Sequence, residues 1–246
     1  MEKKTVLITG ASRGLGAAIA RVFAKNNYNI ILNYNNSEKE ALKLTQELKQ
    51  YNVEVLPIKA DVTNEEEVKS MVNNGINTFK KIDVLVNNAG IAIDTTFEDK
   101  TKENFIKTLD TNLIGPFLVS RYVGEHMLNE KQGCIINISS TNGLETYYEY
   151  SLDYDASKAG LISLTHNLAV KYAPYIRVNC VAPGWINTEM NKELDEEYKK
   201  EEESKILLNR FAEPVEIAKV VYFLSTEDAK YINNETIRVD GWTIHA

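Results

Sequence analysis

TVLITGASRGLG, from Thr5 to Gly16, is the stretch from which the architecture of this 246-residue chain can be worked out. A short apolar run is followed at once by a glycine-rich turn and then by an amphipathic pattern, which predicts a strand, a tight turn and a helix. Gly10 would permit the tight turn, Gly14 a close approach of the backbone to a pyrophosphate, and Gly16 close helix-strand packing. Because a helix N-terminus offers free N–H groups and a positive dipole, the turn predicts a dinucleotide site.

The rest of the chain repeats this alternation of apolar runs and amphipathic segments. Strands are predicted at 5–9, 29–34, 53–59, 84–87, 134–139, 178–182 and 236–239. Helices are predicted near 14–26, 37–51, 65–79, 102–109, 112–129, 155–172 and 214–225. Strands that alternate with helices pair in parallel, and runs without polar alternation suit strands covered on both faces. We therefore expect an α/β protein with a Rossmann-like, doubly wound parallel sheet of about seven strands and helices on both faces.

Composition and charge narrow the class of protein. Hydrophobic residues make up 43% of the chain and charged residues 26%, enough for one large core, so residues 1–246 are expected to form a single domain. The net charge of −7 disfavours nucleic acid as a partner. Because the N-terminal apolar run is too short for a signal peptide and no later run approaches about 18 apolar residues, we expect no membrane association and a cytoplasmic location.

The residue types that bind metals are few and scattered. Cys134 and Cys180 lie in strand-like apolar segments without a CxxC motif, so we expect buried, reduced thiols. His126, His166 and His245 are far apart in the chain, and no metal site is expected.

One segment departs from the apolar periodicity. Residues 191–204 are almost all charged, and an apolar face returns only at Ile206, Leu207 and Leu208. Two interpretations stay open: a solvated helix, or a mobile substrate lid spanning residues 187–212, since a helix that buries little apolar surface opens at low cost.

The end of the second predicted strand favours NADP(H) as the cofactor. Enzymes that use NAD usually place an acid there to accept from the ribose 2′-hydroxyl. Here the strand ends with Tyr34, Asn35, Asn36 and Ser37, whose amide and hydroxyl groups can donate to a 2′-phosphate. Arg13 could add a planar cation, although it could also be an ordinary surface charge.

Tyr154 and Lys158 lie four residues apart, on one face of a helix predicted to begin near Asp155. A tyrosine with an ordinary pKa of about 10 exchanges its proton slowly near neutral pH. A neighbouring ammonium stabilises the phenolate, so Lys158 is the expected partner of Tyr154.

Three motifs resemble those of the short-chain dehydrogenase/reductase family: TGxxxGxG at 9–16, NNAG at 87–90 and YDASKAG at 154–160. The resemblance implies that Tyr154 donates a proton to a substrate carbonyl oxygen, that Ser140 hydrogen-bonds this oxygen, and that Lys158 also holds the nicotinamide ribose. It further implies that Asn112 positions a water for proton relay. Asn112 could also cap a helix, and the two roles are compatible.

The resemblance also implies a set of cofactor contacts at the ends of the strands. Asp61 and Val62 would meet the adenine, and the segment from Pro183 to Thr188 the nicotinamide carboxamide. The expected cofactor-binding residues are Gly10, Ser12, Arg13, Gly14, Leu15, Gly16, Tyr34, Asn35, Asn36, Asp61, Val62, Asn88, Ala89, Gly90, Tyr154, Lys158, Pro183, Gly184, Ile186 and Thr188.

The spacing of the expected catalytic serine departs from the family pattern. The serine usually stands thirteen positions before the tyrosine, whereas Ser140 stands fourteen before Tyr154. A one-residue insertion in the loop at 142–151 would explain the difference, because loops tolerate changes in length. Ser140 is the preferred candidate, with Thr141 and Ser139 as alternatives.

The sequence indicates the substrate less clearly than it indicates the reaction. Within the family, the motifs look most like those of members that reduce 3-oxoacyl thioesters on acyl carrier protein with NADPH. They are shared with reductases of small ketones, sugars and steroids, and a non-catalytic NADP-binding sensor is a further alternative. The expected substrate pocket is apolar and aromatic, with Ile91, Ile93, Leu144, Tyr147, Trp185 and Met190.

The expected partners follow from charge and from the resemblance. An acidic carrier protein needs a basic docking face, yet Lys131 and Lys171 form no dense cluster, which argues against this partner. The resemblance implies a homotetramer built through the helices at 112–129 and 155–172.

Overall fold

The computed structural model describes residues 3–145, 148–188 and 194–243. Within these residues, seven strands form one parallel sheet in the order β3-β2-β1-β4-β5-β6-β7. The strands are β1 (Thr5–Ile8), β2 (Asn29–Tyr34), β3 (Val55–Lys59), β4 (Val84–Asn87), β5 (Gly133–Ile138), β6 (Ile176–Pro183) and β7 (Thr236–Val239). The helices are α1 (Gly14–Lys25), α2 (Glu38–Leu48), α3 (Glu65–Phe79), α4 (Lys102–Leu109), α5 (Gly115–Glu130), α6 (Leu152–Tyr172), α7 (Glu196–Ser204) and α8 (Pro214–Ser225). The predicted Rossmann-like architecture is confirmed.

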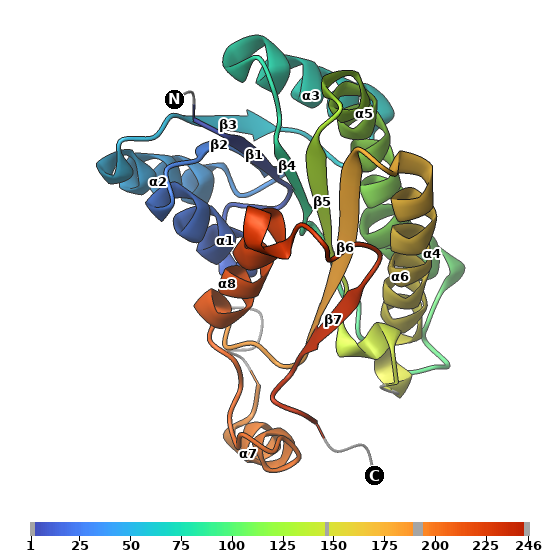
Figure 1. Cartoon of the computed structure of the whole chain (residues 1–246). Helices are drawn as coiled ribbons and strands as arrows, with labels where there is room; N and C mark the ends of the chain where they lie inside the picture. Colours follow the sequence, from blue (N-terminus) through green and yellow to red (C-terminus); the bar gives the residue numbers. More distant parts are fainter. Residues whose placement is uncertain (1–2, 146–147, 189–193, 244–246) are drawn as a thin grey trace.

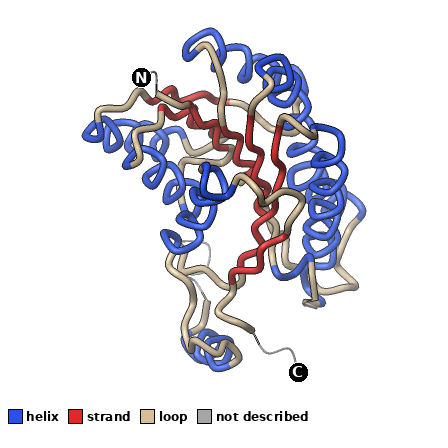
Figure 2. The backbone as a smooth tube through the Cα atoms, in the orientation of Figure 1, coloured by secondary structure: helices blue, strands red, loops and turns tan. Residues whose placement is uncertain are grey.

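Helices cover both faces of the sheet (Figures 1 and 2). Helices α1, α2 and α8 lie on one face, and α3, α4, α5 and α6 lie on the other. Strand β1 shows why its sequence lacks polar alternation: Val6 and Ile8 are fully buried under α1 and α8, while Leu7 is fully buried on the opposite face. Successive side chains of a strand point to opposite faces, so both sets must be apolar here.

The strand order reverses direction between β1 and β4. From β1 the chain continues to β2 and β3 on one side, whereas β4 to β7 follow on the other. The loops that leave the carboxyl ends of β1 and β4 therefore diverge, and in open parallel sheets ligands bind in this crevice.

Two helices begin three residues away from their predicted starts. Helix α6 begins at Leu152 rather than near Asp155, so Tyr154 lies in its first turn. The helix expected to start at Asn112 is also placed wrongly, because a π-helical turn, Asp110–Ile114, joins α4 to α5 without interruption. Such a turn fits one extra residue into a helix and is frequent at functional sites.

The charged segment contains α7, a helix with no buried residue. The apolar face expected after it is only partly present: Ile206 is buried, but Leu207 and Leu208 are more than half exposed. These three residues lie outside regular helix, and Ile206 instead bridges to Thr243.

Cys134 and Cys180 are both buried and free, as predicted. In the part of the chain that the structure describes, no helix has the length and apolar character needed to cross a membrane.

Candidate active site

The turn between β1 and α1 is braced by β2. Gly10 adopts a φ of +60°, which side chains rarely allow, and its N–H donates to Asn33 Oδ1 at 3.2 Å. Ala11 N–H donates to the Asn33 carbonyl at 2.8 Å. Asn33 thus holds two successive peptide groups of the turn, a role not predicted from the sequence. Its signal is a buried polar residue inside the apolar strand NIILNY.

The turn also lies tightly against the residues that follow β4. Asn88 Nδ2 donates to the carbonyls of Thr9 and Gly10, at 2.9 and 3.0 Å. A Cβ on Gly16 would overlap the Gly10 carbonyl oxygen and lie 2.6 Å from Asn88 Nδ2, so only glycine fits there. The approach of α1 to the strand ends therefore depends on Gly16.

The N-terminus of α1 fits an anion. The helix begins at Gly14, and Arg13 supplies no side-chain cap, so the first N–H groups of the helix are available to a bound phosphate. Arg13 is exposed, whereas Ser12 and Leu15 are half-buried. Thr188 bounds the space from the β6 side, since a Cβ on Gly14 would lie 3.9 Å from Thr188 Cβ.

Polar groups at the ends of β2 and β3 form one hydrogen-bonded patch. Asn35 Nδ2 donates to Asp61 Oδ2 at 2.9 Å, and Thr63 donates to Oδ1 through its N–H and its hydroxyl. Burial opposes ionisation of Asp61, but the hydrogen bonds from Thr63 and Asn35 outweigh it and lower the pKa. Tyr34 is buried, and Asn35 and Asn36 are exposed, so two amides border the patch.

The remaining predicted cofactor residues lie at the same carboxyl edge of the sheet. Their backbone is ordered by the sheet and by neighbouring loops: Gly184 N–H donates to the Val239 carbonyl at 3.2 Å, and Ile186 bridges to Ala212. Val62 and Pro183 are buried, Ala89, Gly184 and Ile186 are half-buried, and Gly90 is exposed.

Asn112 is fully buried inside the π-helical turn, where it binds two neighbouring segments. Its Nδ2 donates to the Ile91 carbonyl at 2.8 Å and to Ser157 Oγ at 3.0 Å, and its Oδ1 accepts from Ile91 N–H at 2.8 Å. Asn112 does not cap a helix, because the helical chain continues on both sides of it. It fixes the first residue after NNAG against α6.

Tyr154, Ser140 and Lys158 meet where β5 ends and α6 begins. The Ser140 hydroxyl lies close enough to the Tyr154 phenol to lower its pKa. Lys158 Nζ lies 5.4 Å from the centre of the Tyr154 ring and donates to the Ile138 carbonyl at 2.9 Å. The structure thus brings these three predicted residues together, with Asn112 behind them through Ser157.

Of the alternatives to Ser140, Ser139 faces elsewhere. Its hydroxyl is buried and donates to the Lys158 carbonyl at 2.8 Å, so it fastens β5 to α6. Ser140 has the contact with Tyr154 despite the longer spacing, because short 3₁₀ turns at Thr141–Gly143 and Glu149–Ser151 take up part of the intervening loop.

Burial sets the protonation states of the two titratable groups. It raises the pKa of Tyr154 to about 12, against a smaller lowering by the nearby Ser140 hydroxyl. It lowers the pKa of Lys158 to about 8. At neutral pH the site therefore holds a neutral phenol, which is a proton donor, beside a lysine that is still mostly charged.

The segment after β6 is fastened to α7. The Trp185 ring stacks on Phe211 with centroids 5.3 Å apart, and its Nε1 donates to Glu202 Oε2 at 3.0 Å. Tyr198, also on α7, lies close enough to Tyr148, which precedes α6, for each hydroxyl to shift the pKa of the other. Helix α7 thus reaches both the segment after β6 and the loop before α6.

The predicted substrate pocket is described only in part. Ile91, Ile93 and Trp185 are half-buried and Leu144 is 41% exposed, while Tyr147 and Met190 lie outside the described residues.

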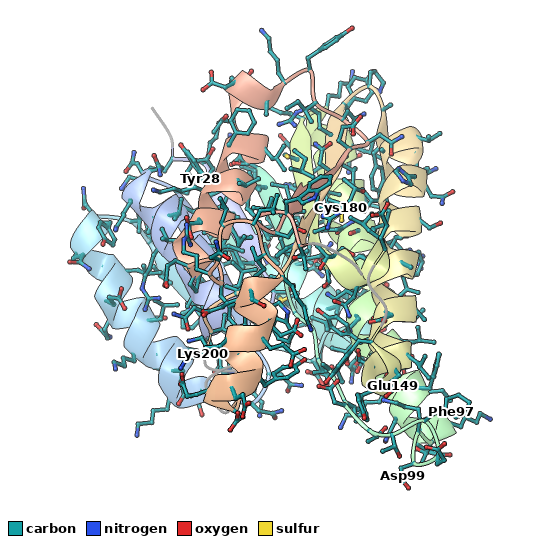
Figure 3. All side chains as sticks on the ribbon, turned by 90° about the horizontal axis from the view of Figure 1, so that it is seen from below. Tyr28, Phe97, Asp99, Glu149, Cys180 and Lys200 are labelled. Carbon is teal, nitrogen blue, oxygen red and sulfur yellow. The ribbon has the colours of Figure 1, made fainter. Side chains whose placement is uncertain are left out.

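The loop after β4, which carries Ile91 and Ile93, is fastened to the start of α6. Lys100 Nζ donates to the Ile93 carbonyl and forms an ion pair with Asp153. Figure 3 shows Phe97 and Asp99 of this loop beside Glu149, and Thr95 N–H donates to the Tyr150 carbonyl at 3.0 Å.

Comparison with known proteins identifies the family of the chain. A family model described as enoyl-(acyl carrier protein) reductase matches residues 10–242. The 3-oxoacyl-[acyl-carrier-protein] reductase FabG of Staphylococcus aureus is 39% identical over 239 residues, which are 97% of each chain. The protein of the same name from Staphylococcus epidermidis is also 39% identical, over 97% of this chain and 98% of its own.

The chain belongs to the short-chain dehydrogenase/reductase family. Solved members superpose closely on it: a mutant short-chain dehydrogenase/reductase of Serratia marcescens has a TM-score of 0.92 at 30% identity, covering 97% of this chain and 96% of its own. A dehydrogenase/reductase of Sinorhizobium meliloti has the same TM-score and identity, over 98% and 95%. As a member of this family, the protein is an oxidoreductase that acts on CH–OH and C=O groups, and the family uses a nicotinamide cofactor.

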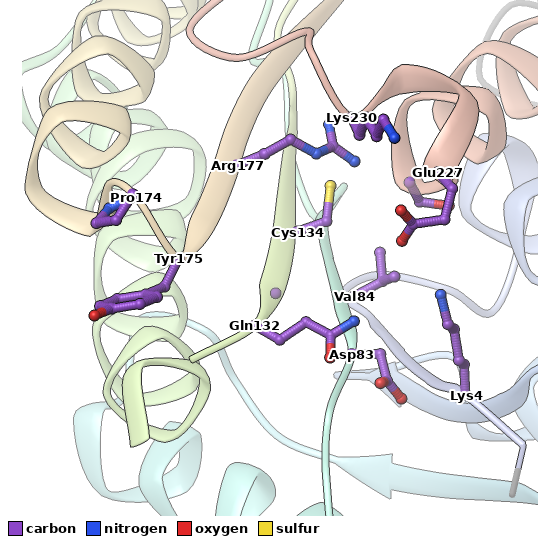
Figure 4. A pocket seen from close by; sticks show the side chains of 12 residues that line it. Lys4, Asp83, Val84, Gln132, Cys134, Pro174, Tyr175, Arg177, Glu227 and Lys230 are labelled. Carbon is purple, nitrogen blue, oxygen red and sulfur yellow. The ribbon is translucent and has the colours of Figure 1, made fainter. Parts of the chain in front are cut away.

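A cavity of about 220 Å³ in this short-chain dehydrogenase/reductase lies away from the site (Figure 4). Its lining includes Lys4, Asp83, Gly133 and Arg177, which stand at or beside the starts of β1, β4, β5 and β6. The cavity is therefore at the amino edge of the sheet, opposite Tyr154. The guanidinium of Arg177 there donates to the carbonyls of Leu224, Thr226 and Ile232 and supports the end of α8.

Proposed function

We propose that the protein is an NADPH-dependent carbonyl reductase whose preferred substrate is a 3-oxoacyl thioester. The observation that carries the proposal is the placement of the Tyr154 phenol beside Ser140 and Lys158, with Lys158 Nζ 5.4 Å from the centre of the Tyr154 ring. The 39% identity to two reductases named for 3-oxoacyl-[acyl-carrier-protein] supports the substrate class.

Each residue of the group has a separate proposed task. The nicotinamide cofactor supplies the hydride when bound. Tyr154 donates its proton to the substrate oxygen, and Ser140 hydrogen-bonds the same oxygen while its charge develops. Lys158 stabilises the phenolate that remains, because an opposite charge favours the ionised form. Asn112 holds the Ile91 backbone and Ser157 in place behind Tyr154 and would position a relay water.

The residues present fit a dinucleotide, and the NADP form is favoured. The free N–H groups at the uncapped N-terminus of α1 can bind a pyrophosphate. Gly16 keeps this helix close to the turn after β1. The exposed residues at the end of β2 are Asn35 and Asn36, whose amides do not repel a 2′-phosphate as a carboxylate would. Arg13 is exposed at the start of α1, where its guanidinium could bind the same phosphate. We therefore propose NADP(H) rather than NAD(H).

The chain is proposed to work as one cytoplasmic domain, residues 1–246, with residues 187–212 as its substrate lid. Assembly into a homotetramer through α5 and α6 is supported by apolar side chains left exposed in this region, namely Phe117 at 40%, Ile114 at 43% and Val170 at 77%. Acyl carrier protein is the proposed carrier of the substrate, although the net charge of −7 weakens attraction to an acidic partner.

Loss of NADPH absorbance with a panel of carbonyl compounds tests the proposal. Acetoacetyl thioesters of acyl carrier protein and of coenzyme A are compared with small ketones, sugars and steroid ketones, and with an enoyl thioester, which has no oxygen on the carbon to be reduced. Tyr154→Phe should lower turnover by about three orders of magnitude, since it removes the donor and keeps the ring. Tight NADPH binding without turnover of any carbonyl would favour a sensor instead. Light scattering after size exclusion tests the tetramer.

A further inference from the structure

Asn33 is a buried amide inside the apolar strand β2, with an exposure of 2%. Its Oδ1 accepts from Gly10 N–H at 3.2 Å, in the turn after β1. Its Nδ2 donates on the other side to the Ala60 carbonyl at 3.0 Å and to the Ile58 carbonyl at 3.4 Å. One side chain of the middle strand therefore bridges the turn after β1 and the end of β3.

The two segments that Asn33 joins belong to different parts of the proposed cofactor site. Gly10 opens the turn that leads to the N-terminus of α1, where the pyrophosphate is proposed to bind. Ala60 directly precedes Asp61, which forms the polar patch on the adenosine side together with Asn35. Because Asn33 itself is buried, it can act on a bound dinucleotide only through these segments.

Opposite hydrogen-bond requirements explain why an amide stands at this position. The Gly10 N–H can only donate, so the side chain must accept on that side, and the Ala60 carbonyl can only accept, so the side chain must donate there. A carboxylate would supply acceptors alone, and an apolar side chain of the same size would supply neither bond. These partners also fix which end of the Asn33 amide faces which segment.

The main chain secures the two sides of Asn33 unequally. Strands β2 and β3 stay paired through the sheet, and beyond it Ala60 N–H donates to the Tyr34 carbonyl at 2.9 Å. The turn after β1 is bound to β2 by a main-chain bond from Ala11 N–H to the Asn33 carbonyl at 2.8 Å. Loss of the Asn33 side chain should therefore loosen Gly10, while the ends of β2 and β3 stay together.

We infer that Asn33 is a positioning residue for the cofactor, whose amide holds the phosphate-binding turn at a fixed place relative to the adenosine side. Both segments are then ready for one dinucleotide before it binds, which lowers the cost of ordering them. This inference rests on the proposed NADP(H) site. A ligand that spans both segments should depend on Asn33, whereas a ligand that meets the adenosine side alone should not.

Direct binding measurements test the inference. Asn33→Leu keeps the size of the side chain and removes both sets of bonds. The Kd of NADPH, measured from its fluorescence on binding, should rise at least about tenfold. Adenosine 2′-monophosphate carries the adenine, ribose and 2′-phosphate without a pyrophosphate, and its Kd, measured by competition with NADPH, should rise less than about threefold. The KM for acetoacetyl coenzyme A at saturating NADPH should stay within about twofold of the parent.

Asn179 supplies a matched control, because it is a fully buried amide of β6 with the same pattern of bonds. Its Oδ1 accepts from Glu235 N–H at 3.0 Å, and its Nδ2 donates to the Ile232 carbonyl at 3.0 Å, both in the segment before β7 at the amino edge of the sheet. Asn179→Leu should lower the unfolding temperature as Asn33→Leu does, but leave the Kd of NADPH within about twofold of the parent. Asn33→Ser is a second variant at the site, and its hydroxyl is too short to reach both segments, so the same Kd should rise at least about threefold.

Equal rises in the Kd of NADPH and of adenosine 2′-monophosphate would overturn the inference, as would an equal rise in the Kd of NADPH for Asn179→Leu. An unchanged Kd of NADPH in Asn33→Leu would overturn it too, and Asn33→Ser decides if Asn33→Leu does not fold. The proposed function fails on a different result, a parent enzyme that binds NADPH but reduces no carbonyl compound. The binding comparison would still decide the role of Asn33 in that case.

Discussion

Lys100 Nζ lies 2.8 Å from Asp153 Oδ1, and both side chains are buried, with exposures of 5% and 0%. The other oxygen of Asp153 accepts from the Thr108 hydroxyl at 2.6 Å. Burial opposes ionisation of Asp153, but the hydrogen bonds from Lys100 and Thr108 outweigh it and lower its pKa. One buried charge pair thus joins the loop after β4 to the residue that precedes Tyr154.

Removal of Lys100 alone should destabilise the protein strongly. Lys100→Met leaves the Asp153 carboxylate buried without its cation, and the free energy of unfolding should fall by ~3–5 kcal/mol in urea titrations. The double variant Lys100→Met/Asp153→Leu removes both charges and should regain most of the loss. A double variant as unstable as the single one would show that packing, rather than the unpaired charge, is responsible.

Adjacent serines should differ sharply in their effect on turnover. Ser140→Ala should lower kcat by about 10²-fold or more, because it removes a hydrogen bond to the developing oxyanion. Ser139→Ala is the matched control: its hydroxyl binds the Lys158 carbonyl, so kcat should stay within about threefold of the parent. Steady-state kinetics with acetoacetyl coenzyme A decides between them, and the reverse ranking would move the role to Ser139.

The pH dependence of kcat should reveal the ionisation of Lys158. Burial lowers the pKa of this lysine to about 8, so the ammonium is present below that pH and is lost above it. If the charge stabilises the phenolate, kcat should be level below about pH 8 and fall above it. Tyr154, with a pKa of about 12, stays protonated throughout. Lys158→Arg keeps the charge at all these values, so whatever activity it retains should lack the alkaline fall.

A carboxylate at the end of β2 should shift the cofactor preference. Asn36→Asp places a negative charge where the 2′-phosphate is proposed to bind, and the ratio of kcat/KM for NADPH to that for NADH should fall at least about tenfold. Asn73→Asp adds the same charge at an exposed position of α3 and should leave the ratio unchanged. A parent enzyme that used NADH as well as NADPH would contradict the proposal directly.

Most strands and helices could be predicted from the sequence because a strand that is buried on both faces is an apolar run without polar alternation. Residues 6–8 are such a run, with Val6 and Ile8 on one face of the sheet and Leu7 on the other, so helices must cover both faces. The start of α3 was also readable, since Asn64 caps it by accepting from Glu66 N–H and Glu67 N–H.

The π-helical turn around Asn112 was not readable from sequence. The Asn112 side chain stabilises this turn through hydrogen bonds with Ile91 and Ser157, which are distant in the chain. Contacts between residues so far apart leave no pattern in the local sequence. The same is true of Asn33, whose role depends on the end of β1 lying beside it.

Trp185 and Trp242 are the two indoles of the chain, and their surroundings differ. Trp185 is stacked on Phe211 and bound to Glu202 of α7, whereas Trp242 is 61% exposed beside Arg238. An indole that leaves an apolar stack for water emits at longer wavelength. In a Trp242→Phe protein, the remaining tryptophan fluorescence would come from Trp185, which anchors α7. The emission maximum would therefore shift to longer wavelength when this helix opens, without an added label.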